Sequence, residues 1–145
     1  MSDHLRLDDQ LCFALYAASR AMTAAYAPVL EKLELTYPQY LAMLVLWEDD
    51  GSRVSRIGER LHLDSATLTP LLKRLEAREL IERRRSEADE RVVEVFLTAA
   101  GKRMKRQAAE IPRCMFDKFD LDVAELVQLR GQVKELTEKL RAAES

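Results

Sequence analysis

The feature that most constrains the fold is a change of hydrophobic period in the middle of the chain. Residues 53–62 and 64–78 each place apolar residues three or four positions apart, which predicts two short helices joined by a tight turn. Residues 91–97 are instead rich in β-branched side chains and predict a strand, with residues 81–85 as its partner and 86–90 as a polar turn. So small a hairpin is not stable alone and has to pack against helices. The segment therefore predicts a helix-turn-helix followed by a β-hairpin wing.

Longer helices are predicted on both sides of this segment. Residues 7–27 carry one apolar face, and Pro28 is expected to kink or restart that helix. A short buried helix follows over residues 40–47, and helical spacing resumes at residue 98 and continues to about residue 119. The last helix begins at a capping box over residues 122–125. We predict a mainly α-helical fold with a small β-hairpin (α+β), that is, a winged helix-turn-helix.

The apolar faces at the two ends of the chain lie far in sequence from the central module. Because few residues lie between, these faces have to pack on each other, and a second copy of the chain buries them most economically. We expect one domain over residues 1–145 that forms a homodimer through residues 5–35 and 98–143, with residues 37–97 as the winged module. A monomeric helix bundle is the alternative.

Charge is distributed unevenly along a chain whose net charge is only −2. Residues 53–106 hold 14 basic and 9 acidic residues, whereas the remainder holds 9 and 16. A basic surface that meets a polyanion explains this pattern, and randomly clustered charge on a helix-rich surface explains it equally well.

The chain shows no signal for export or for membrane insertion. Its N-terminus lacks a basic stretch followed by an apolar run, and the longest apolar stretch, Leu41–Trp47, is too short to span a bilayer. We therefore expect a cytoplasmic protein with no membrane partner, in which the two cysteines do not form a permanent structural disulfide.

The second helix of the central pair has a face suited to the major groove of double-stranded DNA. This face lies opposite the leucines and is small, hydroxylated and basic. The residues that we predict to contact DNA from it are Ser65, Ala66, Thr67, Thr69, Pro70, Lys73 and Arg74. Small side chains allow close approach, while Thr, Lys and Arg reach bases or phosphates. Pro70 conflicts with an interior helical position, so the helix either restarts with Thr69 as its N-cap or bends there.

The predicted hairpin concentrates cations. Arg83, Arg84, Arg85 and Arg91 lie on it, and Asp89 precedes Arg91 by two residues. An aspartate that holds a groove-inserted arginine would orient it in advance. A surface hairpin laced by salt bridges is the alternative, but the position directly after a helix-turn-helix favours contact with DNA.

The sequence of this module resembles a known family. The run LDSATLTPLLKRLEARELIERRRSEADERVVEVFLTAAGK is similar to the recognition helix and wing of MarR-family regulators, including their Asp-x-Arg pattern. The run LDDQLCFALYAASRAMTAAYAPVLEKLELTYPQYLAMLVLWE resembles, more narrowly, the branch that responds to organic hydroperoxides, the OhrR-type repressors. The resemblance covers most of residues 7–112 and implies a repressor that binds an inverted-repeat operator and is released on oxidation.

The resemblance also implies a sensing site. Cys12 occupies the place of the peroxide-reactive thiol, and Tyr16, Tyr26 and Tyr37 occupy those of three tyrosines whose hydroxyls, partly from the other subunit, hydrogen-bond the thiolate. A phenol that donates to sulfur lowers the pKa of the thiol and makes it more reactive, and a helix N-terminus acts in the same direction. The alternatives are a small buried hydrophobe for Cys12 and core or interface packing for the tyrosines.

The second cysteine departs from the pattern of the branch. Two-cysteine members carry their resolving cysteine where this chain has Leu121, whereas Cys114 lies earlier, inside the preceding predicted helix. We expect Cys114 to be unrelated to sensing, with an intersubunit disulfide to Cys12 as the alternative. A low-molecular-weight thiol is a further candidate partner of oxidised Cys12.

Three other functions compete with this interpretation. A MarR-type regulator released by a small aromatic ligand in the dimer crevice would share the DNA module and need no thiol chemistry. A thiol peroxidase would need a reductant path, and the chain has no Cys-x-x-Cys pair and no convincing His base in His4 or His62. A helical interaction module without DNA leaves the basic hairpin unexplained. The two His and two distant Cys do not have the spacing of metal ligands, so we predict no metal site. We also predict no enzyme activity and no cofactor.

Overall fold

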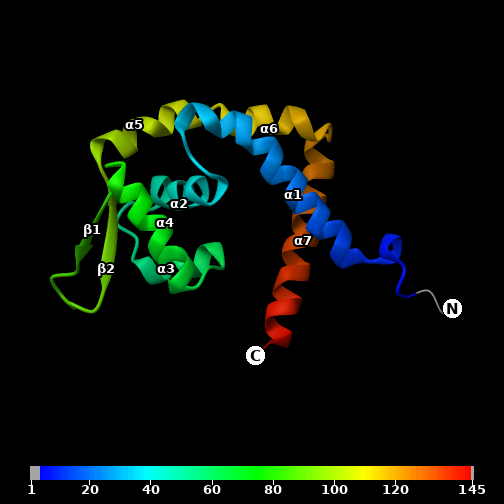
Figure 1. The fold of residues 1–145 in the computed structure, drawn as a ribbon, viewed down its shortest axis with the longest axis horizontal. Helices are drawn as coiled ribbons and strands as arrows, with labels where there is room; N and C mark the ends of the chain where they lie inside the picture. The colour runs from blue at the N-terminus through cyan, green and yellow to red at the C-terminus, as the bar shows by residue number, and fades with distance from the viewer. Residues whose placement is uncertain (1–3, 145) are drawn as a thin grey trace. The chain divides into compact units, whose positions relative to one another are not determined.

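The computed structural model describes residues 4–144, and it is helical with one two-stranded antiparallel hairpin (Figure 1). The elements in chain order are the 3₁₀ turn η1 (Leu7–Asp9), α1 (Leu11–Leu30), the 3₁₀ turn η2 (Glu31–Leu33), α2 (Tyr37–Glu48), α3 (Val54–Leu61), α4 (Ser65–Ala77), β1 (Ile81–Arg85), β2 (Val93–Leu97), α5 (Ala99–Ala108), α6 (Ile111–Phe119) and α7 (Val123–Ala143). The chain divides into two compact units between Ile111 and Pro112. The predicted mainly helical fold with a small hairpin is confirmed.

Side-chain caps begin the helices where the sequence places them. The Asp64 carboxylate accepts a hydrogen bond from the Thr67 N–H at 2.8 Å and starts α4. Asp122 and Glu125 form the predicted reciprocal capping box at the start of α7. Each cap satisfies N–H groups that a helix leaves without a partner in its first turn. These starts are therefore fixed by residues within one turn of the boundary.

A tight turn joins α3 to α4. His62 adopts a left-handed conformation with φ 58°, and the Leu63 N–H donates to the Gly58 carbonyl at 2.9 Å. A Cβ on Gly58 would lie 2.8 Å from the Leu63 carbonyl oxygen, so only glycine allows this approach without a shift of the backbone. The turn fixes the angle at which α4 leaves α3.

The hairpin is anchored to the helical core on both of its strands. Ile81 of β1 pairs with Leu97 of β2, and Ile81 and Val95 are buried. The far edge of β2 is also paired, because the Gly51 N–H donates to the Val95 carbonyl and the Val95 N–H to the Ser52 carbonyl, both at 2.9 Å. The largest fully buried side chains of this unit are Leu30, Met43, Leu46, Ile57, Leu68, Leu72, Leu75, Ile81 and Val95.

Two helix boundaries near the N-terminus differ from the prediction. The first helix begins at Leu11 and not at residue 7, because residues 7–9 form a 3₁₀ turn and Gln10 has an extended backbone with ψ 114°. Pro28 lies inside α1, and the helix continues to Leu30. Proline removes the hydrogen bond that the Ala24 carbonyl would otherwise accept, but this loss does not end the helix, which continues two residues beyond Pro28.

Three further boundaries differ. α4 passes through Pro70 as a single helix, so it does not restart at Thr69. The predicted helix over residues 98–119 is divided between Ala108 and Ile111 into α5 and α6. The second strand begins at Val93, because residues 86–92 close a turn in which the Ser86 N–H donates to the Val92 carbonyl at 2.8 Å.

Candidate nucleic-acid interface and thiol site

The helix α4 separates an apolar face from a polar one. Leu68, Leu71, Leu72 and Leu75 are buried. The predicted DNA-facing residues lie on the remaining surface: Ser65, Ala66, Thr67, Pro70, Lys73 and Arg74 are exposed, and Thr69 is half-buried. Because Pro70 has no N–H, the carbonyl of Ala66 lacks the partner that an α-helix would give it. This surface can therefore offer hydroxyls, cations and backbone acceptors to a neighbouring molecule.

Two arginines of the hairpin are held by glutamates. The Arg83 side chain donates two hydrogen bonds to Glu76 of α4, at 2.9 and 3.1 Å, and its backbone N–H donates a third at 3.0 Å. These bonds hold the pKa of Glu76 below its ordinary value. Arg84 donates twice to Glu82 at 3.1 Å and stacks on the ring of Phe96, 4.5 Å from its centroid. Arg83 thus ties the hairpin to α4, and Arg84 covers the hairpin's own surface.

The turn of the hairpin presents the other two arginines. The Arg91 guanidinium donates twice to the Asp89 carboxylate at 3.2 Å, and the Arg91 side chain is 91% exposed. These bonds lower the pKa of Asp89. Arg85 donates to the Glu90 carbonyl at 2.8 Å. An ion pair this exposed contributes little to stability, so the Asp89 contact chiefly limits the directions in which Arg91 points.

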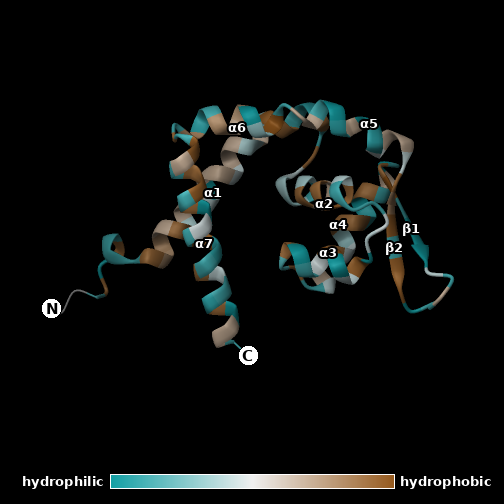
Figure 2. Cartoon of the chain, turned by 180° about the vertical axis from the view of Figure 1, so that it is seen from behind, coloured by the Kyte–Doolittle hydropathy of each residue, from teal (hydrophilic) through white to brown (hydrophobic). Residues whose placement is uncertain are grey.

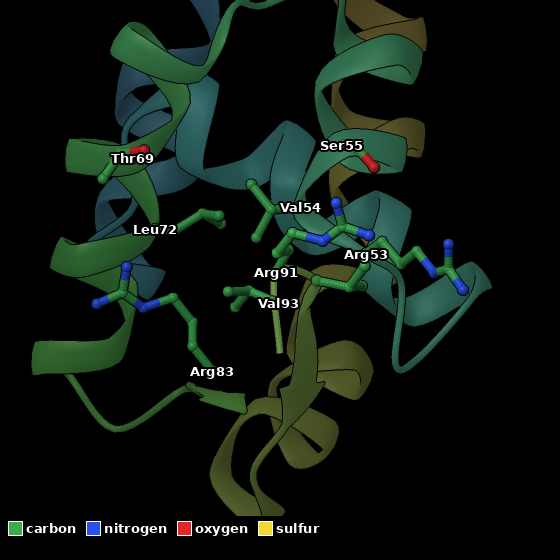
Figure 3. Close-up of a pocket in the computed structure, with 9 residues that line it drawn as sticks. Arg53, Val54, Ser55, Thr69, Leu72, Arg83, Arg91 and Val93 are labelled. Carbon is green, nitrogen blue, oxygen red and sulfur yellow. The ribbon is translucent and has the colours of Figure 1, made fainter. Parts of the chain in front are cut away.

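A cleft of about 290 Å³ lies between α3, α4 and the hairpin. Figure 3 shows arginines around an apolar floor. The arginines are Arg53, Arg83 and Arg91, and the floor includes Val54, Leu72 and Val93. Such a cleft can bind the phosphates of a DNA backbone through Arg53 and Arg91 and contact the sugars through its floor. Arg53 was not predicted as a DNA-contacting residue. Its position immediately before the first helix of the helix-turn-helix is the signal that could have identified it.

The candidate thiol lies near the N-terminus, far in sequence from the residues that line this cleft. Cys12 is the second residue of α1 and is exposed. Tyr16 follows one turn later, on the same face, and is 59% exposed, with Arg20 stacked 5.5 Å from its ring centroid. Cys114 of α6 is also an exposed free thiol. Neither cysteine is in a disulfide.

The other two predicted tyrosines form a cluster with a third. The Tyr26 and Tyr37 rings lie 4.7 Å apart, and Tyr40 joins them at 5.8 and 6.4 Å. Burial, followed by the charges of the two neighbouring tyrosines, raises the pKa of Tyr26 to about 12, and burial also raises the pKa of Tyr37. Both hydroxyls therefore stay protonated and able to donate. Tyr40 was not predicted as a site residue, although it lies three positions after Tyr37 on one helix.

The thiol and this tyrosine cluster lie at opposite ends of α1. Tyr26 follows Cys12 by 14 residues on the same helix. At 1.5 Å per residue the two side chains are separated by roughly 21 Å along the axis. A single chain thus brings Tyr16 to Cys12 and Tyr26 to Tyr37, and it does not bring the two pairs together.

Apolar residues occur along α1 and, separately, along α7, as the colouring of Figure 2 shows, and several of their side chains are exposed. On α1 they include Leu11, Phe13 and Met22, and on α7 they are Val123, Val127, Leu129, Val133 and Leu140. Contiguous exposed apolar surface on a helix marks a surface that contacts another molecule. Within residues 4–144 no cluster of acidic, His or Cys side chains could hold a metal ion, and no helix has the length and hydrophobicity of a membrane span.

Comparison with known proteins gives both a family and a fold. Residues 24–108 match the family described as transcriptional regulator SarA/Rot. The chain is 49% identical to the organic hydroperoxide resistance transcriptional regulator of Bacillus subtilis strain 168, over 95% of this chain and 94% of that protein.

Solved structures of AbfR, a protein of Staphylococcus epidermidis, share the fold. Reduced AbfR bound to DNA superimposes with a TM-score of 0.85 at 32% identity, over 99% of both chains. Disulfide-formed AbfR superimposes with a TM-score of 0.63 at 34% identity, over 97% of this chain and 93% of that one. The relatives therefore include a DNA complex and an oxidised form.

Proposed function

Because this chain belongs to the MarR-type family of winged-helix transcriptional regulators, in its organic-hydroperoxide-responsive branch, we propose that oxidation of Cys12 by an organic hydroperoxide releases it from DNA. The chain is a DNA-binding transcriptional regulator and not an enzyme. The observation that carries the proposal is the exposed Cys12 thiol in the first turn of α1, with Tyr16 one turn away on the same face. The thiolate is the form of a cysteine that attacks a peroxide.

A second copy of the chain completes the sensing site. Because Tyr26 lies roughly 21 Å along α1 from Cys12 and Tyr37 packs against Tyr26, their hydroxyls serve the thiol of another chain. Antiparallel pairing of two α1 helices brings the tyrosines of one copy to Cys12 of the other. The exposed apolar side chains of α1 and α7 supply the surface that this homodimer buries. Residues 5–35 and 98–143 are the proposed dimerisation segments.

The homodimer presents two copies of α4 to successive major grooves, about 34 Å apart, on an inverted repeat. The exposed face of α4 reads the groove. Arg85 and Arg91, in and next to the turn of the hairpin, contact the backbone or the minor groove, while the glutamate-bound Arg83 and Arg84 set the position of the hairpin. Repression follows when the operator overlaps a promoter.

The chemical step uses the oxidant alone. The Cys12 thiolate sulfur attacks the terminal oxygen of the hydroperoxide, the O–O bond breaks, and the alkoxide takes a proton and leaves as an alcohol. The sulfur loses two electrons and becomes a sulfenic acid, while the hydroperoxide is reduced. A low-molecular-weight thiol then condenses with the sulfenic acid, forming a disulfide and releasing water.

Oxidation changes the hydrogen bonding at a packed interface. The added oxygen, or a thiol adduct, occupies space beside the tyrosines, and the donors that served a thiolate no longer fit. Because α1 helps to set the separation of the two copies of α4, a small shift misaligns both half-sites. Nearly complete release requires the oxidised form to disfavour the binding geometry by about 5.5 kcal/mol.

The test is a gel shift with the full chain. The probe is a duplex that the reduced wild-type protein selects from a random-sequence pool, and the oxidant is cumene hydroperoxide. We expect wild-type protein to release the duplex on oxidation, and Cys12→Ser to bind normally and to ignore the oxidant. Cys114→Ser is the matched control and should still release.

Other outcomes contradict specific parts of the proposal. Release of Cys12→Ser by peroxide would refute the sensor assignment and leave release by a small aromatic ligand as the better explanation. Persistent binding of oxidised Cys114→Ser would show that a disulfide to Cys114 is required. A monomer by light scattering at micromolar concentration, binding a half-site tightly, would refute the two-chain site.

A further inference from the structure

We propose that Arg78 is a positioning residue that couples the connector between α1 and α2, which leads directly into Tyr37, to the C-terminal end of α4. The inference rests on the proposed function, because it names the path by which a change at the tyrosines reaches the recognition helix. Arg78 is the C-cap of α4, and its backbone N–H donates to the Arg74 carbonyl. Its side chain leaves α4 and binds a segment more than forty residues earlier in the chain.

The contacts of Arg78 are directed at backbone carbonyls. One guanidinium nitrogen donates to the Glu34 carbonyl at 2.5 Å, and another donates to the Leu33 carbonyl at 3.0 Å. The Glu34 carboxylate is 3.7 Å away and its side chain is 83% exposed, so it adds only a screened attraction. The Arg78 side chain is 31% exposed. A cation at the end of the η2 turn also satisfies carbonyls that a helical turn leaves without partners.

Buried leucines and a capping box fix the path of the connector from this contact to Tyr37. Glu34 adopts a left-handed conformation with φ 54°, and the buried Leu33 and Leu35 hold it on either side. Thr36 then forms a capping box with Gln39, with hydrogen bonds of 3.0 and 3.3 Å, and Tyr37 is the first residue of α2. A displacement of Tyr37 therefore moves the carbonyls that Arg78 holds.

The hydrogen bonds of Arg78 suit a switch. A charged hydrogen bond depends steeply on distance and angle. Arg78 therefore transmits a shift of the connector to α4 until its bonds break. Loss of the guanidinium should leave the reduced protein able to bind DNA and should weaken the response of α4 to oxidation.

The test compares Arg78→Gln with Arg60→Gln in the full chain. Arg60 is a matched control because it also joins two helices, donating to Glu48 at 2.6 Å, and is 35% exposed. The measured quantity is the ratio of the dissociation constants of the oxidised and reduced forms, by fluorescence anisotropy on the selected duplex. We expect Arg78→Gln to lower this ratio about tenfold. The dissociation constant of its reduced form should stay within threefold of the wild-type value. Arg60→Gln should match wild type.

Two further variants separate positioning from simple stabilisation. Arg78→Lys keeps the positive charge but loses the planar guanidinium that donates to two carbonyls at once. Its ratio of dissociation constants should therefore lie between those of Arg78→Gln and the wild type. Glu34→Gln keeps the backbone carbonyls and should keep the ratio; an equal loss in this variant would overturn the carbonyl link. An unchanged ratio in Arg78→Gln, or a loss of reduced-state binding together with a lower thermal midpoint, would overturn the proposal. Wild-type protein that ignores peroxide would instead refute the proposed function itself.

Discussion

Replacement of Gly101 by alanine tests how closely α5 approaches the chain before the hairpin. A Cβ at position 101 would lie 2.2 Å from the Leu80 carbonyl oxygen and 3.2 Å from the Leu97 Cδ2 atom. The Leu80 oxygen belongs to the backbone and accepts a hydrogen bond from the Thr98 N–H at 3.1 Å. It has to move by about 1.2 Å to reach the 3.4 Å at which ordinary contact begins, and that movement breaks the bond.

The expected cost follows from these contacts. Overpacking of this kind costs about 1–3 kcal/mol, the lost hydrogen bond adds about 1 kcal/mol, and alanine recovers about 0.5–1 kcal/mol as the better helix former. The free energy of unfolding should therefore fall by about 2 kcal/mol, which lowers Tm by about 4–8 °C in a chain of this size. The Trp47 indole donates to the Gly101 carbonyl at 2.9 Å, so the emission of this single tryptophan should also change.

The assay is urea unfolding followed by circular dichroism at one fixed protein concentration, because association shifts the apparent stability. Gly131→Ala in α7 is the matched control, since no atom of the same chain lies within 4 Å of a Cβ there. It should raise the free energy of unfolding by about 0.5–1 kcal/mol. Wild-type stability in Gly101→Ala would refute the close approach of α5 to Leu80.

Three other predictions concern a strained residue, an acid-sensitive contact and the DNA interface. Glu79 has φ 59°, so Glu79→Gly should raise the free energy of unfolding by about 1 kcal/mol, and a lower urea midpoint would contradict this. Hydrogen bonds from Arg83 lower the pKa of Glu76 from 4.5, so their stabilisation is present above that pH and is lost as pH falls through the lower folded value. Glu76→Gln should remove this loss in thermal melts at about pH 3–7, and an unchanged pH profile would show that the contact is not its source. Lys73→Ala and Arg91→Ala should each reduce the slope of log affinity against log salt by about one unit; an unchanged slope by anisotropy means no phosphate contact.

Local signals made most of the fold predictable. Asp64 and Asp122 are recognisable as N-caps because a cap depends only on residues within one turn. The break between α5 and α6 is signalled by Pro112, the second residue of α6, because proline disfavours the helical conformation of the residue before it, but the prediction did not use this signal. The buried Met104, Ala108 and Ile111 are spaced four and three apart across it, so the apolar pattern of one helix continues through the break.

The sequence indicated which residues form the candidate site better than it indicated which residues they contact. The spacing of Cys12 and Tyr16 places both on one helix face, and the DNA-facing stripe of α4 follows from the same rule. The contact between Arg83 and Glu76 does not follow from helix spacing. Glu76 lies seven residues earlier and meets Arg83 only because the chain reverses between α4 and β1. Arg78 likewise depends on a contact that no local pattern records.

The placement of Cys12 and Tyr26 at opposite ends of α1 has a genetic consequence. If the sensing site is shared between two chains as proposed, an allele carrying Cys12→Ser and an allele carrying Tyr26→Phe and Tyr37→Phe should each fail to respond to peroxide. In a mixed dimer of the two, one site combines the Cys12→Ser chain with the substituted tyrosines of its partner. The other site has wild-type Cys12, Tyr26 and Tyr37. The mixed dimer should therefore regain a response that neither homodimer shows by itself.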